Sequence, residues 1–413
     1  MTAELPTTLL TAPSAGVPGV TRTVAQLAAA TERLLAASGP LAIDTERAHG
    51  FRYAPKAYLI QLRRGPGQAV LLDPIAFEPD AKSRADFSEL AAGLSQTQWI
   101  IHAAAQDMPA LAEVQLLPKR LFDTELAGRL LNYPLVNLNA MTESLLGVSL
   151  LKEHSAADWS TRPLPPEWLN YAALDVELLA DLRDCLRAEL EGAGKLDWAE
   201  QEFAHLVKHG ADPPSKRPDP WRRTSGLHNV RTPRGMAVVR SLWEAREQLA
   251  AATDIAPGRI LRDAAITDMA MRFDDGSPAI NANLLRSMGY FRKTAARQYE
   301  AVWLAALREA AALSPKELPP RASKPTGIPH PRNWERRSPA SYDRWQRVRP
   351  AVVAKAEEVQ VPVENLLSPD AMRNVLWEAP AAIDASGLDA LLAGQQVRQW
   401  QRELIVPVML AAW

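Results

Sequence analysis

The sequence predicts a mixed β-sheet flanked by helices, followed by all-helical domains. Short apolar segments typical of strands alternate with helical patterns at the start, and helical spacing then dominates to the end. The length of 413 residues exceeds one ordinary hydrophobic core, so two or three domains are expected. These observations favour an α/β domain first and helical domains after it.

The N-terminal elements follow from local patterns. Residues 1–22 are rich in Thr, Pro, Ala and Gly without periodicity and are expected to form a disordered lead. Thr23 is a plausible N-cap for a helix to about residue 37. The turn at 64–67 is short enough to make its flanking strands antiparallel. The remaining expected elements are strands over 41–44, 58–62, 69–73 and 99–102, a helix over 86–94, and almost unbroken helix from Asp107 to about His209.

The second half divides at two proline-rich, basic stretches. The two helical segments that they delimit share a short match at a constant offset of 105, with Pro257 aligned to Pro362. This match predicts an internal repeat. The expected units are a basic linker over 210–234, a helical domain over 235–313, a Pro-rich basic linker over 314–340 and a second helical domain over 341–413.

Composition excludes several classes of protein. The net charge is −1, so no global field attracts nucleic acid, although basic residues gather in the linkers. Cys185 is the single cysteine, so no internal disulfide can form, which fits a reducing cytoplasm. We expect neither a secretory signal nor a membrane span, because the longest apolar stretch, residues 404–413, is short and contains a proline.

Two carboxylates end the first predicted strand. Asp44 and Glu46 are two residues apart, so both side chains should point to one side of the strand. Adjacent carboxylates repel unless a cation lies between them, and oxygen ligands suit Mg²⁺ or Mn²⁺. Taken alone, a solvated strand end is the commoner explanation of this pattern.

Two further aspartates lie in settings that admit the same chemistry. Asp107 follows a predicted strand ending at His102 and begins a helix, where it could simply stabilise the helix start. Asp175 shares a helix face with Tyr171, four residues earlier, in a helix that begins at Pro165–Pro166. An aspartate beside a core-facing surface either caps a neighbouring element or binds metal.

Taken in order, these motifs resemble the DEDD exonucleases. Asp-x-Glu, His-(x)₄-Asp and Tyr-(x)₃-Asp match the subclass with tyrosine in the last motif, and the likeness is closest to the ribonuclease D family. It extends to residues 122–127 and 158–164. Residues 242–247 resemble helicase-and-RNase-D C-terminal (HRDC) domains, with 341–413 a weaker, second HRDC-like match.

The resemblance implies a ribonuclease-H-like exonuclease domain over 23–209 and a metal-dependent 3′→5′ exoribonuclease. It would release 5′-mononucleotides during RNA 3′-end processing or decay, with tRNA-like substrates. Asp44, Glu46, Asp107 and Asp175 would bind two divalent cations, Mg²⁺ or Mn²⁺, and Tyr171 would position the attacking water. A DNA 3′→5′ exonuclease or a non-catalytic nucleic-acid-binding protein remains the alternative. None of the four carboxylates is missing, as at least one would be in a degenerate site.

The expected partner is the 3′ end of a single-stranded or structured RNA, bound by a monomer. Lysines and arginines mixed with Trp221 and Trp334 in the linkers suit contacts with phosphates and bases, although solvated coils would look the same. A chain ending near residue 212 is expected to degrade short single strands but to bind long RNA weakly. The candidate RNA-binding residues are Arg162, Arg222, Arg223 and Arg246, with Lys152 also near the last motif and Trp159 more easily explained by packing.

Overall fold

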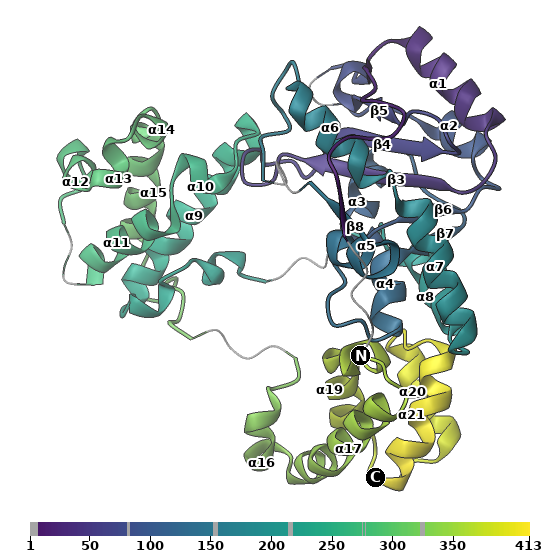
Figure 1. Ribbon diagram of the computed structural model, residues 1–413. Helices are drawn as coiled ribbons and strands as arrows, with labels where there is room; N and C mark the ends of the chain where they lie inside the picture. The colour runs from purple at the N-terminus through teal and green to yellow at the C-terminus, as the bar shows by residue number, and fades with distance from the viewer. Residues whose placement is uncertain are drawn as a thin grey trace.

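A six-stranded mixed sheet forms the centre of the N-terminal domain (Figure 1). The computed structural model describes residues 7–80, 83–151, 156–213, 218–274, 276, 278–322 and 327–413. β3 pairs antiparallel with β4 and parallel with β6, which confirms the mixed sheet and its antiparallel start. The strand order is β2 (Val20–Thr21), β5 (Val70–Leu72), β4 (Ala57–Arg64), β3 (Leu41–Arg47), β6 (Trp99–Ile101) and β7 (Leu121–Asp123).

The N-terminal lead differs from the expectation of disorder wherever the structure describes it. β1 (Thr8–Leu10) pairs in parallel with β8 (Val148–Leu150), and β2 extends the main sheet beside β5. The Thr8 amide donates to the Gly147 carbonyl at 2.8 Å. Such pairing orders a segment that has no periodicity of its own. Residues 1–6 lie outside the described part of the chain.

The region from Asp107 to His209 is also less uniformly helical than predicted. It contains β7 and β8, which have three residues each. A strand this short shows too little alternation to be separated from helical spacing. The helices of the domain are α1 (Val24–Ala36), α2 (Ser88–Gly93), α3 (Met108–Glu113), α4 (Thr124–Leu130), α5 (Leu138–Leu146), α6 (Pro166–Asp175), α7 (Leu179–Gly192) and α8 (Leu196–His209).

Helices cover both faces of the sheet. Leu41, Ile43 and Leu62 face a large core to which α1, α3, α4 and α7 contribute. On the opposite face, Leu59 of β4 packs in a cluster with Ala173 of α6. The α1 helix begins with the predicted cap, because Thr23 accepts a hydrogen bond from the Gln26 amide at 3.2 Å. The two faces therefore bury their apolar residues in separate clusters.

The first all-helical domain has a hydrophobic core of its own, centred on buried Leu242 and Trp303. It follows two short 3₁₀ turns, η3 (Pro220–Arg223) and η4 (Leu227–Asn229). Its helices are α9 (Pro233–Thr253), α10 (Pro257–Ile260), α11 (Asp263–Asp274), α12 (Ala282–Arg286), α13 (Gly289–Arg292), α14 (Thr294–Arg297) and α15 (Glu300–Ala312).

This domain contacts the N-terminal domain through the loop between β3 and β4. Asp254 accepts a hydrogen bond from the Ala54 amide at 2.9 Å, and the Ala256 amide donates to the Phe51 carbonyl at 3.0 Å. The Arg259 guanidinium donates to the Gly50 carbonyl at 2.7 Å. The loop that follows Glu46 is therefore attached to the helical domain.

The C-terminal domain, in contrast, shares one continuous core with the N-terminal domain. Trp198 of α8 stacks on Trp400 with ring centroids 4.8 Å apart. Glu202 accepts hydrogen bonds from Arg398 at 2.7 Å and from the Trp400 indole at 2.9 Å. Figure 1 shows α21 beside the end of α8. The elements are η5 (Pro331–Asn333), α16 (Trp334–Arg337), α17 (Pro339–Glu358), α18 (Val363–Leu366), α19 (Pro369–Glu378), α20 (Ala385–Gly394) and α21 (Gln399–Ala411).

The repeated segment has the same backbone in both helical domains. α10 and α18 are each one turn long and follow a residue with φ of 51°, Asp254 and Gln360 respectively. Each ends at an extended leucine, Leu261 with φ −150° and Leu367 with φ −151°. The structural match lies one residue further along than the sequence match that aligned the two prolines.

Candidate active site

β3 carries two of the predicted acidic residues on one face. Because side chains alternate along a strand, Asp44 and Glu46 point away from the face that buries Leu41 and Ile43. In the antiparallel pairing with β4, Asp44 lies opposite Gln61 and Glu46 opposite Leu59. The two carboxylates are therefore held on a central strand at one face of the sheet.

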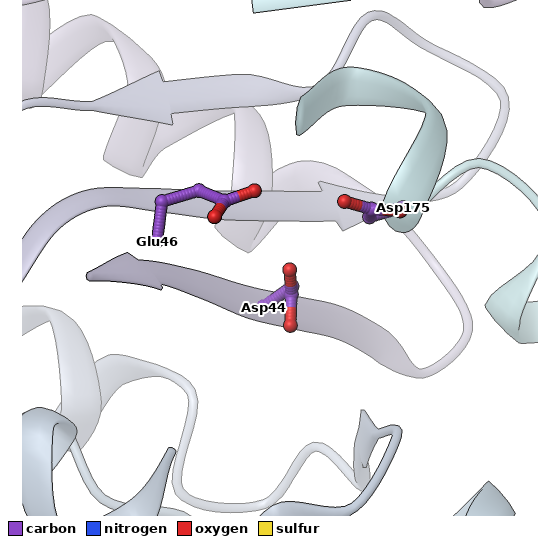
Figure 2. Close-up of side chains that lie close together, drawn as sticks. All are labelled: Asp44, Glu46 and Asp175. Atoms are coloured by element: carbon purple, nitrogen blue, oxygen red, sulfur yellow. The ribbon is translucent and has the colours of Figure 1, made fainter. Parts of the chain in front are cut away.

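The α6 helix brings Asp175 to the same place. The helix begins with Pro166 at its first turn, as predicted, and Asp175 is its last residue. Ala172 and Ala173 pack in the cluster that holds Leu59 of β4, which fixes the helix against the sheet. Figure 2 shows Asp175 at the helix end, close to Glu46 and Asp44.

Asp44, Glu46 and Asp175 form a compact acidic cluster. One carboxylate oxygen from each lies within 4.8 Å of the others. Burial, together with repulsion from the neighbouring carboxylates, raises the pKa of Asp44 and of Glu46 well above their ordinary values. Burial also raises the pKa of Asp175 to about 7. Three carboxylates held this closely repel one another, and a cation bound between them would stabilise their ionised forms.

Asp107 lies beside this cluster and not within it. It precedes α3, but its side chain makes no capping hydrogen bond, so the helix-cap explanation does not hold. Its carboxylate accepts a hydrogen bond from Thr45 Oγ1 at 2.6 Å and lies 3.7 Å from the Arg47 guanidinium. Its charge still raises the pKa of Asp44 and Asp175, and burial raises its own pKa to about 6.

Tyr171 stands one helical turn before Asp175 and its hydroxyl hydrogen-bonds that carboxylate. Burial and the three nearby carboxylates raise the pKa of the phenol further above its ordinary value. The phenol therefore stays protonated at neutral pH and acts as a hydrogen-bond donor and not as a base.

Gln61 is a polar neighbour that the sequence interpretation missed. Its side chain is fully buried, and neither its amide nitrogen nor its amide oxygen has a hydrogen-bond partner among the described residues. As the cross-strand partner of Asp44, it lies on the face that carries the acidic cluster. A glutamine inside the apolar run Tyr58–Leu62 was the signal that could have found it.

His102 is separate from the site. Its Nδ1 lies 2.9 Å from the Thr124 hydroxyl, and it also hydrogen-bonds the Val136 backbone. Burial lowers the pKa of this imidazole to about 4. The side chain is a neutral, structurally bonded histidine.

Most of the predicted RNA-binding side chains are already occupied by protein contacts. Arg162 donates to both oxygens of Asp73 and to three backbone carbonyls. Arg246 is buried and pairs with Asp263 at 2.7 Å, and Arg222 donates to the carbonyls of Pro320 and Arg321. Arg162 and Arg246 therefore serve contacts within the protein.

The predicted aromatic contacts are corrected in the same way. Trp221 and Trp334 are buried, because each contributes to a domain core. Neither can therefore stack on a base. Trp159 is also buried, as its packing explanation predicted. Arg223 is exposed. Lys152, residues 214–217 of the first linker and residues 323–326 of the second lie outside the described residues.

Comparisons with known proteins divide the chain into three matched regions. Residues 20–191 match the family described as 3′-5′ exonuclease and residues 236–307 the HRDC domain. Residues 327–413 match the family described as 3′ to 5′ exonuclease C-terminal domain, a different description from HRDC.

Relatives and solved structures agree with these matches. The chain is 32% identical to the ribonuclease D of Nitrobacter hamburgensis over 304 residues, 72% of this chain and 75% of the relative. A protein from Bifidobacterium adolescentis of known structure is 37% identical, with a TM-score of 0.86 over 98% of this chain and 99% of that one. Escherichia coli RNase D, described as an exoribonuclease involved in structured RNA processing, shares the fold, with a TM-score of 0.62 and 23% identity over 91% of this chain and 98% of that one.

Proposed function

This chain belongs to the ribonuclease D family and is a 3′→5′ exoribonuclease, and we propose that Asp44, Glu46, Asp107 and Asp175 hold the cations for its hydrolysis. The observation that supports this assignment is the compact cluster of buried Glu46 and half-buried Asp44 and Asp175, with oxygens within 4.8 Å. Asp107 adds a fourth carboxylate beside it.

The residues present fit divalent cations. Arg47 is the positive group whose charge lowers the pKa of Asp44, and burial and the other carboxylates outweigh it. The donors are all carboxylate oxygens, which hard cations such as Mg²⁺ or Mn²⁺ prefer. We propose two such ions. When bound, they would neutralise the phosphodiester and assist its attack by water.

The side chains of this chain have distinct roles in the proposal. Asp44 and Glu46 are fixed by the strand, and Asp175 by the packed end of α6, so the acidic cluster needs little rearrangement. Tyr171 donates a hydrogen bond to Asp175 and keeps that carboxylate oriented beside the reacting phosphate. The expected products are 5′-mononucleotides released from an RNA 3′ end.

The biological setting is proposed more broadly. RNA 3′-end processing or decay, with tRNA-like substrates, is the setting that we propose, in the cytoplasm. A monomer suffices, because all five site residues come from one chain. We propose an exonuclease unit over 23–209, an HRDC unit over 235–313 and an HRDC-like unit over 341–413, joined by the linkers 210–234 and 314–340. The support for the last unit is the shared backbone of α10 and α18.

Asp44→Asn tests the proposal. The change keeps the size of the side chain and removes the charge at the centre of the cluster, so turnover of a short RNA should fall on the order of a thousandfold or more. Asp343→Asn, at an exposed aspartate of α17, is the matched control and should keep full activity. Near-normal hydrolysis by Asp44→Asn with Mg²⁺ or Mn²⁺ present would rule out the assignment. A DNA strand of the same sequence, assayed in parallel, tests the DNA-exonuclease alternative.

A further inference from the structure

The C-terminal domain contains a cavity of about 560 Å³, far in sequence from the catalytic residues. It lies between α17 and the segment from α18 to α19, with η5 at its rim. This volume is in the range of sites that hold a nucleotide-sized ligand. None of the acidic-cluster residues contributes to its lining.

The polar lining of the cavity is positively charged. Arg332, Arg349 and Arg373 line it beside His330 and Gln346, and no carboxylate of a described residue does. Arg332 and Arg349 are exposed, and neither guanidinium forms a hydrogen bond or ion pair with any described residue. The cavity therefore offers uncommitted donors to an anion, and Arg and phosphate form strong paired hydrogen bonds.

Arg373 adds a buried donor. Its guanidinium lies 3.1 Å from Asp370 at one end, but its Nε is buried and has no partner among the described residues. A buried N–H without an acceptor costs free energy, so one residue of the cavity wall keeps an unsatisfied donor.

The rest of the lining is apolar and partly aromatic. Trp345 and Tyr342 are half-buried, and Leu367 and Met372 are buried beneath the opening. Trp345 is held edge-on against buried Trp334, with ring centroids 5.4 Å apart and an interplanar angle of 72°. An indole fixed in this way offers a pre-oriented surface for a flat ring.

Flat aromatic surface beside unpaired arginines is the combination that single-stranded nucleic acid uses. Bases stack on aromatic rings while phosphates contact the cations. An acidic peptide could pair with the arginines, but its carboxylates would make no use of the aromatic rings of Trp345 and Tyr342. Elsewhere, Arg162, Arg222 and Arg246 are bonded to protein acceptors, whereas the guanidinium groups of Arg332 and Arg349 have no such acceptor in the described part of the chain.

We propose that this cavity binds one nucleotide of the RNA substrate upstream of the 3′ end that enters the catalytic site. The base lies against Trp345 and Tyr342, and the adjoining phosphates contact Arg332 and Arg349. This inference rests on the proposed RNA substrate, and it gives the C-terminal domain a role in holding long RNA.

The test compares two double variants of the full chain. Arg332→Ala with Arg349→Ala removes the unpaired cations of the cavity. Arg336→Ala with Arg347→Ala removes two exposed arginines of α16 and α17 that do not line it. Binding to a long unstructured RNA is measured across a salt series, with Ca²⁺ in place of the catalytic cation. Thermal unfolding checks that both variants fold as the native chain does.

The cavity variant should bind the long RNA about tenfold more weakly, with a salt slope lower by about one to two units. The control variant should match the native chain in slope, and both should degrade a short oligonucleotide at the native rate. Photocrosslinking with 5-iodouridine in the long RNA should label Trp345 or Tyr342.

The possible failures are distinguishable. If the two double variants have equal affinities and slopes, and neither Trp345 nor Tyr342 is labelled, the cavity does not bind RNA. If the native chain also fails to degrade the short oligonucleotide, the proposed function fails as well. Weaker binding of the cavity variant to an acidic peptide, with RNA binding intact, would assign the cavity to a protein partner instead.

Discussion

The Thr45 hydroxyl donates a 2.6 Å hydrogen bond to the Asp107 carboxylate, across 62 positions of sequence. Thr45 stands between Asp44 and Glu46, and its side chain points to the other side of β3. One strand therefore presents two carboxylates directly and orients a third through its intervening residue. This relationship makes Thr45 a positioning residue for the acidic site.

Thr45→Val should weaken the function of Asp107 without removing its charge. The change keeps the branched shape and deletes the hydroxyl, so the cost is one charge-assisted hydrogen bond of about 1.5–3 kcal/mol. We expect kcat to fall by about tenfold to a hundredfold and half-maximal activity to require more Mg²⁺. Thr45→Ser, which retains the hydroxyl, should restore most of the activity. Equal Mg²⁺ requirements in all three proteins would contradict the positioning role.

Gln61→Leu should change the stability of the metal-free protein and the turnover of RNA in opposite directions. The Gln61 amide is buried without a partner among the described residues, so an apolar replacement of similar size should stabilise the metal-free protein by about 1–3 kcal/mol. Turnover should fall if the amide serves the neighbouring Asp44. Urea unfolding and a short-RNA assay measure the two effects. A destabilised variant would show that the amide has a structural partner.

The acidic site should make the stability of the metal-free protein depend on pH. Burial raises the pKa of Asp107 to about 6 and of Asp175 to about 7, above the value of about 3.9 in an unfolded chain. A raised carboxyl pKa stabilises the fold below pH 4, and that contribution is lost as pH rises through 6 to 7. Arg47 lowers the pKa of Asp107, and the hydrogen bond from Tyr171 lowers the pKa of Asp175, so both oppose this loss, but burial outweighs them.

The measurement is the melting temperature with EDTA across this pH range, in the native chain and in Asp175→Asn. The native chain should lose stability relative to the variant as pH rises. Added Mg²⁺ should stabilise the native chain more at pH 8 than at pH 5.5, since the ligands must be deprotonated to bind it (about 1.4 kcal/mol per pKa unit). A pH-independent effect of Mg²⁺ would contradict the shifted carboxyl groups.

Replacing each of two buried tryptophans should affect nuclease activity differently, because they lie in separate cores. Trp400→Ala opens the core that the C-terminal domain shares with the N-terminal domain and should cost about 3–5 kcal/mol, with loss of activity at the same temperature as unfolding. Trp303→Ala affects the separate core of the first helical domain, so degradation of short RNA should persist beyond its transition. Calorimetry with parallel activity assays distinguishes them. Identical loss of activity in both variants would show that the two cores unfold together.

This shared core also changes the expectation for a chain ending near residue 212. Such a chain would expose Trp198 and leave Glu202 without Arg398 and Trp400. We therefore expect it to be destabilised as well as weaker in binding long RNA.

The sequence was sufficient for the elements that local pattern determines. The start of α1 at Thr23, the antiparallel β4–β5 pair and the α6 helix after Pro165 all follow from caps, turns and periodicity, and the structure confirms them. The proximity of Asp44 and Glu46 follows from alternation along one strand.

Contacts between residues far apart in the sequence could not be predicted from these local patterns. Pairing of β1 with β8 gives order to a segment without local pattern, and the stacking of Trp198 on Trp400 depends on how two distant helices pack. An arginine in sequence also does not show what it donates to: Arg246 looked available for RNA, yet it is buried beside Asp263.

The core shared by α8 and α21 sets the order in which the domains of a newly synthesised chain can fold. Chains emerge from the ribosome N-terminus first, and domains usually fold as they appear. Here the nuclease domain needs Trp400 and Ile405 of α21 to fill its core, while the intervening domain can fold earlier around Trp303. A nascent chain therefore completes its nuclease core only after Trp400 and Ile405 have emerged, so the acidic residues of the site are synthesised well before the core that supports them is complete.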